Sequence, residues 1–202
     1  MKGKIPWSYF KSYMICGQQA YLMDLNTEDL SNKFKTEGIS FHKFTQEYMK
    51  LERPPQDKTF NKPELQAFHE FELRRYDWCR KENIPWKPFA LEKEYATDEF
   101  MCIADRIDDN GDKTYTLVEY KRNPSTWDRK QLAFNKFVIE EASGIVINKF
   151  AIWYAQQPDE NYYSTPHKGS LNSMKRKMSL VLPSQIWIFS SQARVRMFLL
   201  RL

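Results

Sequence analysis

The sequence predicts an α/β protein with a mixed central β-sheet flanked by helices. Apolar residues recur at helical spacing through most of residues 1–84. After Pro85 and Pro88 the pattern changes to shorter, β-rich segments, and a further helical segment stands between two of them. Helices that precede and interrupt a series of strands in this order pack on the faces of one sheet.

We expect a single domain over residues 1–202, because a chain of 202 residues with 42% hydrophobic content can bury one substantial core. The pattern divides it into a mainly helical N-terminal part (1–84), a part that combines sheet and helix (85–157) and a basic C-terminal part (158–202).

Helices in the N-terminal part are expected at residues 8–25, 27–50 and 63–81. Asn26 or Thr27 is a suitable N-cap for the second helix, in which Gly38 marks a break or a close contact. Pro63 is a favourable first residue for the third helix. The proline-containing segment 52–62 lacks periodicity and is expected to be a loop.

Strands are expected at residues 89–95, 100–107, 114–120, 146–155 and 185–189, with helices at 126–142 and 192–200 and a basic loop at 159–180. The pair Asn110-Gly111 favours a tight hairpin turn between the second and third strands. Ser125 or Thr126 is expected to cap the helix that follows, and Gly144 to end it.

Positive charge is concentrated at the C-terminal end of the chain. The formal net charge is +5, and residues 161–202 contain seven Lys or Arg and no Asp or Glu. A polyanion is a natural partner for this asymmetry, with Lys175, Arg176 and Lys177 as the residues expected to contact phosphate. The alternative interpretation is a solvated face that keeps the protein soluble.

Two further features narrow the class of protein. No segment has the ~18 consecutive apolar residues of a membrane span, and the N-terminus lacks the pattern of a signal peptide, so we expect a soluble, cytoplasmic protein without membrane contact. The cysteines are Cys16, Cys79 and Cys102, an odd number without a CxxC pair, which argues against a disulfide framework and a zinc knuckle.

Charged residues on the predicted hairpin are the candidate catalytic residues. Glu119 and Lys121 are two residues apart on one strand and therefore share a face, and Asp105 lies on the partner strand. Two carboxylates that converge require a compensating charge. Mg²⁺ fits two carboxylates and a main-chain carbonyl, here that of Tyr120, and would favour hydrolysis of a phosphodiester. A solvated strand of alternating charge is the simpler alternative.

The stretch 100–135 resembles the RecB-like branch of the PD-(D/E)XK nucleases, which includes the CRISPR-associated RecB-like exonucleases. The resemblance lies in Asp105 within Cys102-Ile103-Ala104-Asp105-Arg106-Ile107, in Glu119-Tyr120-Lys121 and in Gln131-Leu132. It implies a restriction-endonuclease-like core in which Asp105, Glu119 and Lys121 are catalytic and Gln131 positions a phosphate or nucleotide.

Upstream motifs occur in the same order as in that branch. Gly38-Ile39-Ser40-Phe41-His42 is similar to its Gly-x-x-x-His motif, and Cys16 followed by Tyr21 is similar to its opening helix. The resemblance implies that His42 joins Asp105, Glu119 and the Tyr120 carbonyl around the metal, and that Glu92 or Glu94 matches an acidic residue of the preceding strand.

The chain also departs from that branch. Asn135 stands where a tyrosine follows Gln131, and no cysteine follows Cys102, so we expect no iron–sulfur cluster. The resemblance implies a Mg²⁺- or Mn²⁺-dependent deoxyribonuclease that acts through a metal-activated water, with single-stranded DNA or free ends favoured. Exonuclease and endonuclease action both stay open. The alternatives are a nucleic-acid-binding protein with this fold and little activity, or a partner-binding protein with exposed charged strands.

Overall fold

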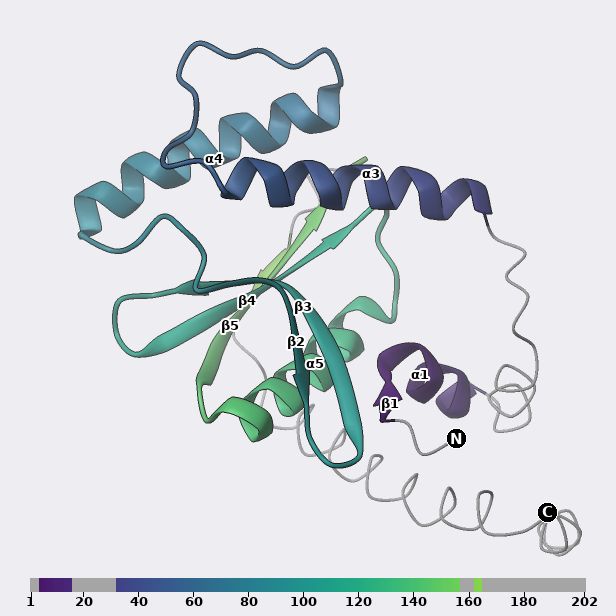
Figure 1. Ribbon diagram of the computed structural model, residues 1–202. Helices are drawn as coiled ribbons and strands as arrows, with labels where there is room; N and C mark the ends of the chain where they lie inside the picture. Colours follow the sequence, from purple (N-terminus) through teal and green to yellow (C-terminus); the bar gives the residue numbers. More distant parts are fainter. Residues whose placement is uncertain (1–3, 16–31, 157–161, 165–202) are drawn as a thin grey trace, which may run out of the picture.

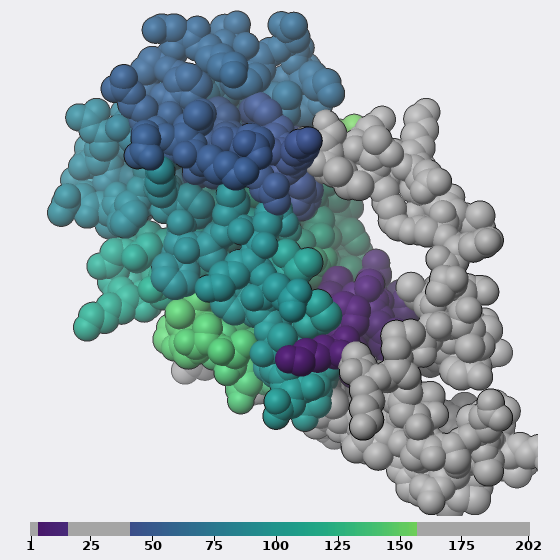
Figure 2. Space-filling view, viewed as in Figure 1, coloured from purple at the N-terminus to yellow at the C-terminus, as the bar shows by residue number. Residues whose placement is uncertain are grey.

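The computed structural model describes residues 4–15, 32–156 and 162–164. Its central layer is one mixed β-sheet with helices over both faces, as the sequence predicts (Figure 1). Helices α3 (Asn32–Met49) and α4 (Pro63–Glu82) cover one face, and α1 (Trp7–Ile15) and α5 (Asp128–Ser143) cover the other. In the space-filling view the blue helical layer lies over the teal strands, and α1 (purple) packs beside them (Figure 2).

Six strands form the sheet: β1 (Ile5–Pro6), β2 (Ala90–Ala96), β3 (Phe100–Asp109), β4 (Thr114–Lys121), β5 (Val146–Tyr154) and β6 (Tyr162–Ser164). The order is β1-β3-β4-β5-β6, and β2 also pairs with β3. Pairings β1–β3 and β4–β5 are parallel and the other three are antiparallel, which makes the sheet mixed.

Both faces of the sheet are buried, so the two apolar clusters of the core lie above and below it. The cluster on the α1 and α5 side contains Phe10, Leu117 and Phe134, and the cluster on the α3 and α4 side contains Phe68, Val118 and Trp153. Adjacent residues of β4 therefore face opposite layers, as the two-residue period of a strand requires.

The edge of β3 that faces β4 is split, and this split lies at the predicted site residue Asp105. β2 occupies one edge of β3 from Met101 to Ile107. β1 and β4 therefore share the other edge, where β1 pairs with Phe100 and Met101 and β4 pairs only from Arg106 onward. Between these two pairings, in the part of the chain that the structure describes, no main-chain ladder bonds this edge of β3.

Most predicted elements are confirmed, with differences at their ends. The helix at 63–81 and the strands at 89–95, 100–107, 114–120 and 146–155 are present within a few residues of their predicted limits. Gly111 and Gly144 adopt the positive φ angles, 81° and 72°, that a tight turn and a helix end require. The predicted helix at 192–200 and strand at 185–189 lie outside the described residues.

Helix α3 is continuous through Gly38, which excludes a break there and leaves the predicted alternative of a close contact. Three other features of local structure differ from the predictions. Helix α5 begins later than predicted, with Trp127 at the N-cap position and no side-chain cap. In the turn before it, the Asp128 carboxylate accepts the Ser125 N–H at 2.7 Å and the Ser125 hydroxyl accepts the Trp127 N–H at 3.2 Å. The strand β6 falls within the predicted loop at 159–180, and the two-residue strand β1 precedes the first predicted helix.

Candidate functional site

Asp105 lies at the split between β3 and β4. The last residue pair between these strands is Arg106 with Val118, and immediately beyond it Asp105 Oδ2 accepts the Tyr120 N–H at 2.8 Å. A side-chain carboxylate thus replaces the main-chain carbonyl that would bond this amide in a continuous ladder. Asp105 is 7% exposed, and its second oxygen, Oδ1, lies 3.8 Å from His42 Nδ1.

Glu92 faces Asp105 from the neighbouring strand. The register places Leu91 opposite Arg106 and Lys93 opposite Ala104, so Glu92 lies opposite Asp105. Its φ angle is 45°, in the left-handed region that costs a non-glycine residue of order 1 kcal/mol or more. Such strain within a strand is typical of a functional position, and here it accompanies the contact between the Glu92 carboxylate and His42.

His42 reaches the site from α3. Its Nδ1 lies 3.1 Å from Glu92 Oε1 and 3.8 Å from Asp105 Oδ1, and its ring contacts that of Tyr120 edge to face. The potential ligand atoms of His42, Glu92 and Asp105 all lie within 4.8 Å of one another. One imidazole nitrogen and two carboxylates therefore converge on a volume that one ion can occupy.

A second polar group, held against α5, adjoins this cluster. Lys121 Nζ donates to Glu119 Oε1 at 2.7 Å and to Gln131 Oε1 at 2.9 Å. Gln131 Nε2 also donates to Glu119 Oε1, at 2.6 Å, and Asn135 Nδ2 donates to Glu119 Oε2 at 3.3 Å. The predicted sharing of one strand face by Glu119 and Lys121 is confirmed, and the helix that follows supplies two amides to the same carboxylate.

The structure thus brings most of the predicted site residues together, but it groups the acidic residues differently from the prediction. Glu92 belongs to the cluster, whereas Glu94 is exposed on the same strand. Glu119 lies outside the group of three ligand atoms and is bonded instead to the side chains from β4 and α5. Its negative charge nevertheless acts on Asp105 and His42, so the two groups form one electrostatic site.

The charges of the site shift its pKa values in consistent directions. Burial, and then the negative charge of Glu119, hold the pKa of Asp105 well above its usual range. Burial alone would lower the pKa of His42, but the hydrogen bond to Glu92 and the charge of Asp105 raise it overall. The pKa of Lys121 is likewise raised by Glu119 against the effect of burial. The negative charge of the site therefore favours the binding of a cation and disfavours a further anion.

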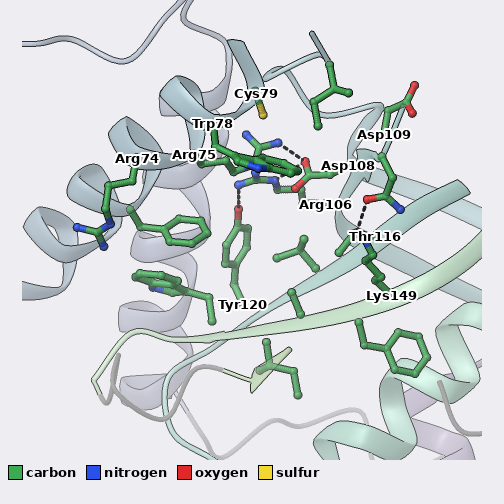
Figure 3. Close-up of a pocket in the computed structure, with 18 of the residues that line it drawn as sticks. Arg74, Arg75, Trp78, Cys79, Arg106, Asp108, Asp109, Thr116, Tyr120 and Lys149 are labelled. Atoms are coloured by element: carbon green, nitrogen blue, oxygen red, sulfur yellow. Dashed lines mark hydrogen bonds and ion pairs between the residues drawn. The ribbon is translucent and has the colours of Figure 1, made fainter. Parts of the chain in front are cut away.

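A buried ion-pair network supports the two strands from the α4 side. Arg106 is 2% exposed, and its guanidinium donates to Glu72 at 2.6 Å, to Asp108 at 2.7 Å and to the Tyr120 hydroxyl at 3.2 Å. Arg75 joins from α4, with Nη2 2.8 Å from Asp108 (Figure 3). Arg106 follows Asp105 on β3, and Tyr120 is the partner of Asp105 on β4, so the network holds both strands at the split.

A cavity of about 570 Å³ lies apart from the polar site. It is bounded by α4 and by β3, β4 and β5, and its lining includes Trp78, Phe71 and Trp153 (Figure 3). The Tyr120 side chain lines it, but His42, Glu92, Asp105, Glu119 and Lys121 do not. The cavity therefore lies on the other side of Tyr120 from the converging carboxylates.

The predicted phosphate contacts Lys175, Arg176 and Lys177 lie outside the described residues. No model of a known protein family matches the sequence, and no curated protein is significantly similar to it. Among the described residues, no helix has both the length and the apolar character needed to cross a membrane.

Proposed function

We propose that the protein is a metal-dependent DNA nuclease with a restriction-endonuclease-like core of the PD-(D/E)XK class. The observation that carries the proposal is the position of Asp105, buried where β3 and β4 separate, beside His42 and Glu92 and within the field of Glu119. Carboxylates gathered in this way are costly without a cation, and their order along the chain matches the resemblance described above.

The donor set fits Mg²⁺ or Mn²⁺. His42, Glu92 and Asp105 would hold the ion, with the Glu119 carboxylate and the Tyr120 carbonyl as the further predicted ligands. Oxygen ligands suit both ions, and an imidazole nitrogen favours Mn²⁺ over Mg²⁺. A bound ion of this kind would supply Lewis-acid stabilisation of a phosphodiester oxygen and a lowered pKa for a bound water.

The chain's own residues would orient the reactants. Glu119 and Gln131 fix the Lys121 ammonium, so its charge is available at a defined point to stabilise a phosphodiester oxygen or to orient the attacking water. Gln131 and Asn135 in turn fix both oxygens of Glu119. Preorganised charge of this kind stabilises a transition state without reorganisation during the reaction.

Cleavage of end-labelled single- and double-stranded DNA in Mg²⁺, Mn²⁺ or EDTA tests the proposal. We expect metal-dependent cleavage that Lys121→Ala lowers by about 100-fold or more, the usual effect of removing a preorganised charge. Lys113→Ala is the matched control, because Lys113 lies in the turn before β4, is exposed, and should leave the rate unchanged.

The outcomes separate the proposal from its alternative. Cleavage that is lost in EDTA and in Lys121→Ala supports the nuclease, and the ladder of products gives its polarity. DNA binding without cleavage in either metal indicates a nucleic-acid-binding protein that retains the fold and lacks the activity. Absence of both binding and cleavage contradicts the proposal.

A further inference from the structure

Two lysines from different helices lie against one tryptophan beside the candidate site. Lys130 Nζ, in the first turn of α5, is 3.9 Å from the centroid of the Trp127 ring, and Lys11 Nζ, on α1, is 5.7 Å from it. Both distances lie within the range of cation–π contacts. The indole therefore holds two positive charges from elements that are far apart in the sequence.

The position of Trp127 is fixed by its surroundings. Its ring packs at 6.4 Å from that of Trp7, and its carbonyl accepts the Gln131 N–H at 2.9 Å as the first turn of α5 closes. The indole is half-buried rather than free in solution. Lys11 and Lys130 are consequently presented by a preorganised platform.

The acid nearest to Lys130 in the sequence, Asp128, does not balance the charge of this platform. Asp128 is buried, and its carboxylate accepts from the Ser125 N–H at 2.7 Å and from the Tyr154 hydroxyl at 3.1 Å. Among the described residues, neither Lys11 nor Lys130 forms an ion pair with a carboxylate. Two like charges near one ring repel each other, and an anion bound beside them would reduce that cost.

The platform adjoins the polar site through α5. Lys130 immediately precedes Gln131, whose amide bonds to both Glu119 and Lys121. Consecutive helical residues point in directions about 100° apart, so Lys130 projects from α5 beside, and not into, the polar site. A polymer whose reacting phosphate is at Lys121 could therefore place a neighbouring phosphate at the platform.

We infer that Lys11 and Lys130, held by Trp127, bind a phosphate of the substrate strand close to the scissile phosphate. The inference rests on the proposed function and extends it, because it gives the path of the strand across the surface where α5 packs against α1. The contact is to the phosphate backbone and is therefore independent of base sequence.

The test measures binding of a fluorescent single-stranded oligo(dT) in EDTA, where no cleavage occurs, as a function of salt. Lys11→Gln combined with Lys130→Gln should weaken binding and lower the slope of log K against log[salt] by about 0.7 for each phosphate that the variant no longer neutralises. The control is Lys62→Gln with Lys81→Gln, which removes equal charge from exposed ends of α4, on the opposite face of the sheet (Figure 1).

Kinetics with metal provide the second measurement. Because neither lysine touches the reacting atoms, the double variant should raise KM several-fold and leave kcat within about twofold of the wild type. Trp127→Leu, which keeps both charges and removes the platform, should weaken binding by about threefold, in line with a cation–π contact.

The outcomes distinguish this inference from the proposed function. If the wild type cleaves DNA and the Lys11/Lys130 double variant binds and turns over like its α4 control, the inference is overturned and the nuclease stands. If the wild type neither binds nor cleaves DNA, the proposed function fails and the inference fails with it. A lower salt slope and a raised KM in the platform variant alone support the inference.

Discussion

At the scale of single residues, Asp105 and Glu92 both occupy unfavourable positions. Asp105 is buried beside other carboxylates, which raises its pKa, and Glu92 has a left-handed backbone within a strand. The Tyr120 N–H and the His42 imidazole offset part of this cost. Sites that bind a ligand commonly retain such local instability, since relieving it would remove the function.

Asp105→Asn should therefore stabilise the metal-free protein while it abolishes cleavage. The amide oxygen can still accept the Tyr120 N–H, and the substitution removes one charge from the carboxylate cluster. We expect the free energy of unfolding in urea to rise by about 1 kcal/mol or more. Asp98→Asn, at an exposed residue between β2 and β3, is the matched control and should leave it unchanged. A loss of stability in Asp105→Asn would contradict this description of the site.

The stabilisation by Asp105→Asn should also depend on pH. A carboxyl whose pKa is raised in the folded state contributes stability at pH values below its unfolded pKa, about 3.9, and loses it as the pH rises through the folded value. The difference in unfolding free energy between Asp105→Asn and the wild type should thus vanish in strong acid and grow above about pH 4. Urea titrations at several pH values without metal measure it, and a constant difference would show that charge is not its cause.

At the scale of elements, α4 holds the strands β3 and β4 at their split through Arg106. Glu72 is fully buried on α4 and accepts from Arg106 and from the Trp86 indole at 2.9 Å. Because a buried charge without a partner is strongly unfavourable, the two residues depend on each other. The network holds Arg106 and Tyr120 in place, and these residues are the chain neighbour and the hydrogen-bond partner of Asp105.

Arg106→Met should destabilise the fold by about 3–5 kcal/mol, because Glu72 and Asp108 lose the Arg106 guanidinium and keep only their ion pairs with Arg75. Glu72→Gln in the same chain should recover part of that loss, since the double variant has one buried charge fewer. A double-mutant cycle measured by thermal unfolding gives the coupling between the two residues. Additive effects of the two substitutions would contradict a direct interaction.

The sequence predicted the regular elements well because their patterns are local. The Asn110-Gly111 turn and the Gly144 helix end follow from backbone chemistry within a few residues. The strands β1 and β6 were missed since each has at most three residues and depends on a distant neighbour for its pairing. The sequence left open whether Glu92 or Glu94 belongs to the site. The left-handed backbone of Glu92 accompanies its place in the site, and no residue type predicts that irregularity.

At the scale of the whole molecule, the site joins the layers of the fold. His42 comes from the helical layer on one face of the sheet, Gln131 and Asn135 come from the layer on the other, and the carboxylates come from the strands between them. Sequence order alone showed which residues to expect but not that Glu119 would bond to α5 side chains. Three-dimensional packing decides that arrangement, so it lay beyond prediction from motifs.

Metal affinity of the intact protein should rise with pH. His42 must be neutral to act as a ligand, and its pKa is raised above the ordinary 6.5, so a proton is released on binding. Affinity for Mn²⁺ should increase from about pH 6 upward until His42 is fully deprotonated. Calorimetric titrations in buffers of different ionisation enthalpy measure both the affinity and the protons released. Affinity that does not change with pH would exclude His42 as a ligand.

The most direct test of the central claim is the stoichiometry of Mn²⁺ binding, measured by electron paramagnetic resonance of the free ion. We predict at least one site per chain that Glu92→Gln and Asp105→Asn each weaken strongly. Glu94→Gln, at an exposed residue two positions after Glu92 on β2, should bind like the wild type. Absence of binding in the wild type, or equal binding in all four proteins, would contradict the assignment of His42, Glu92 and Asp105 as a metal centre.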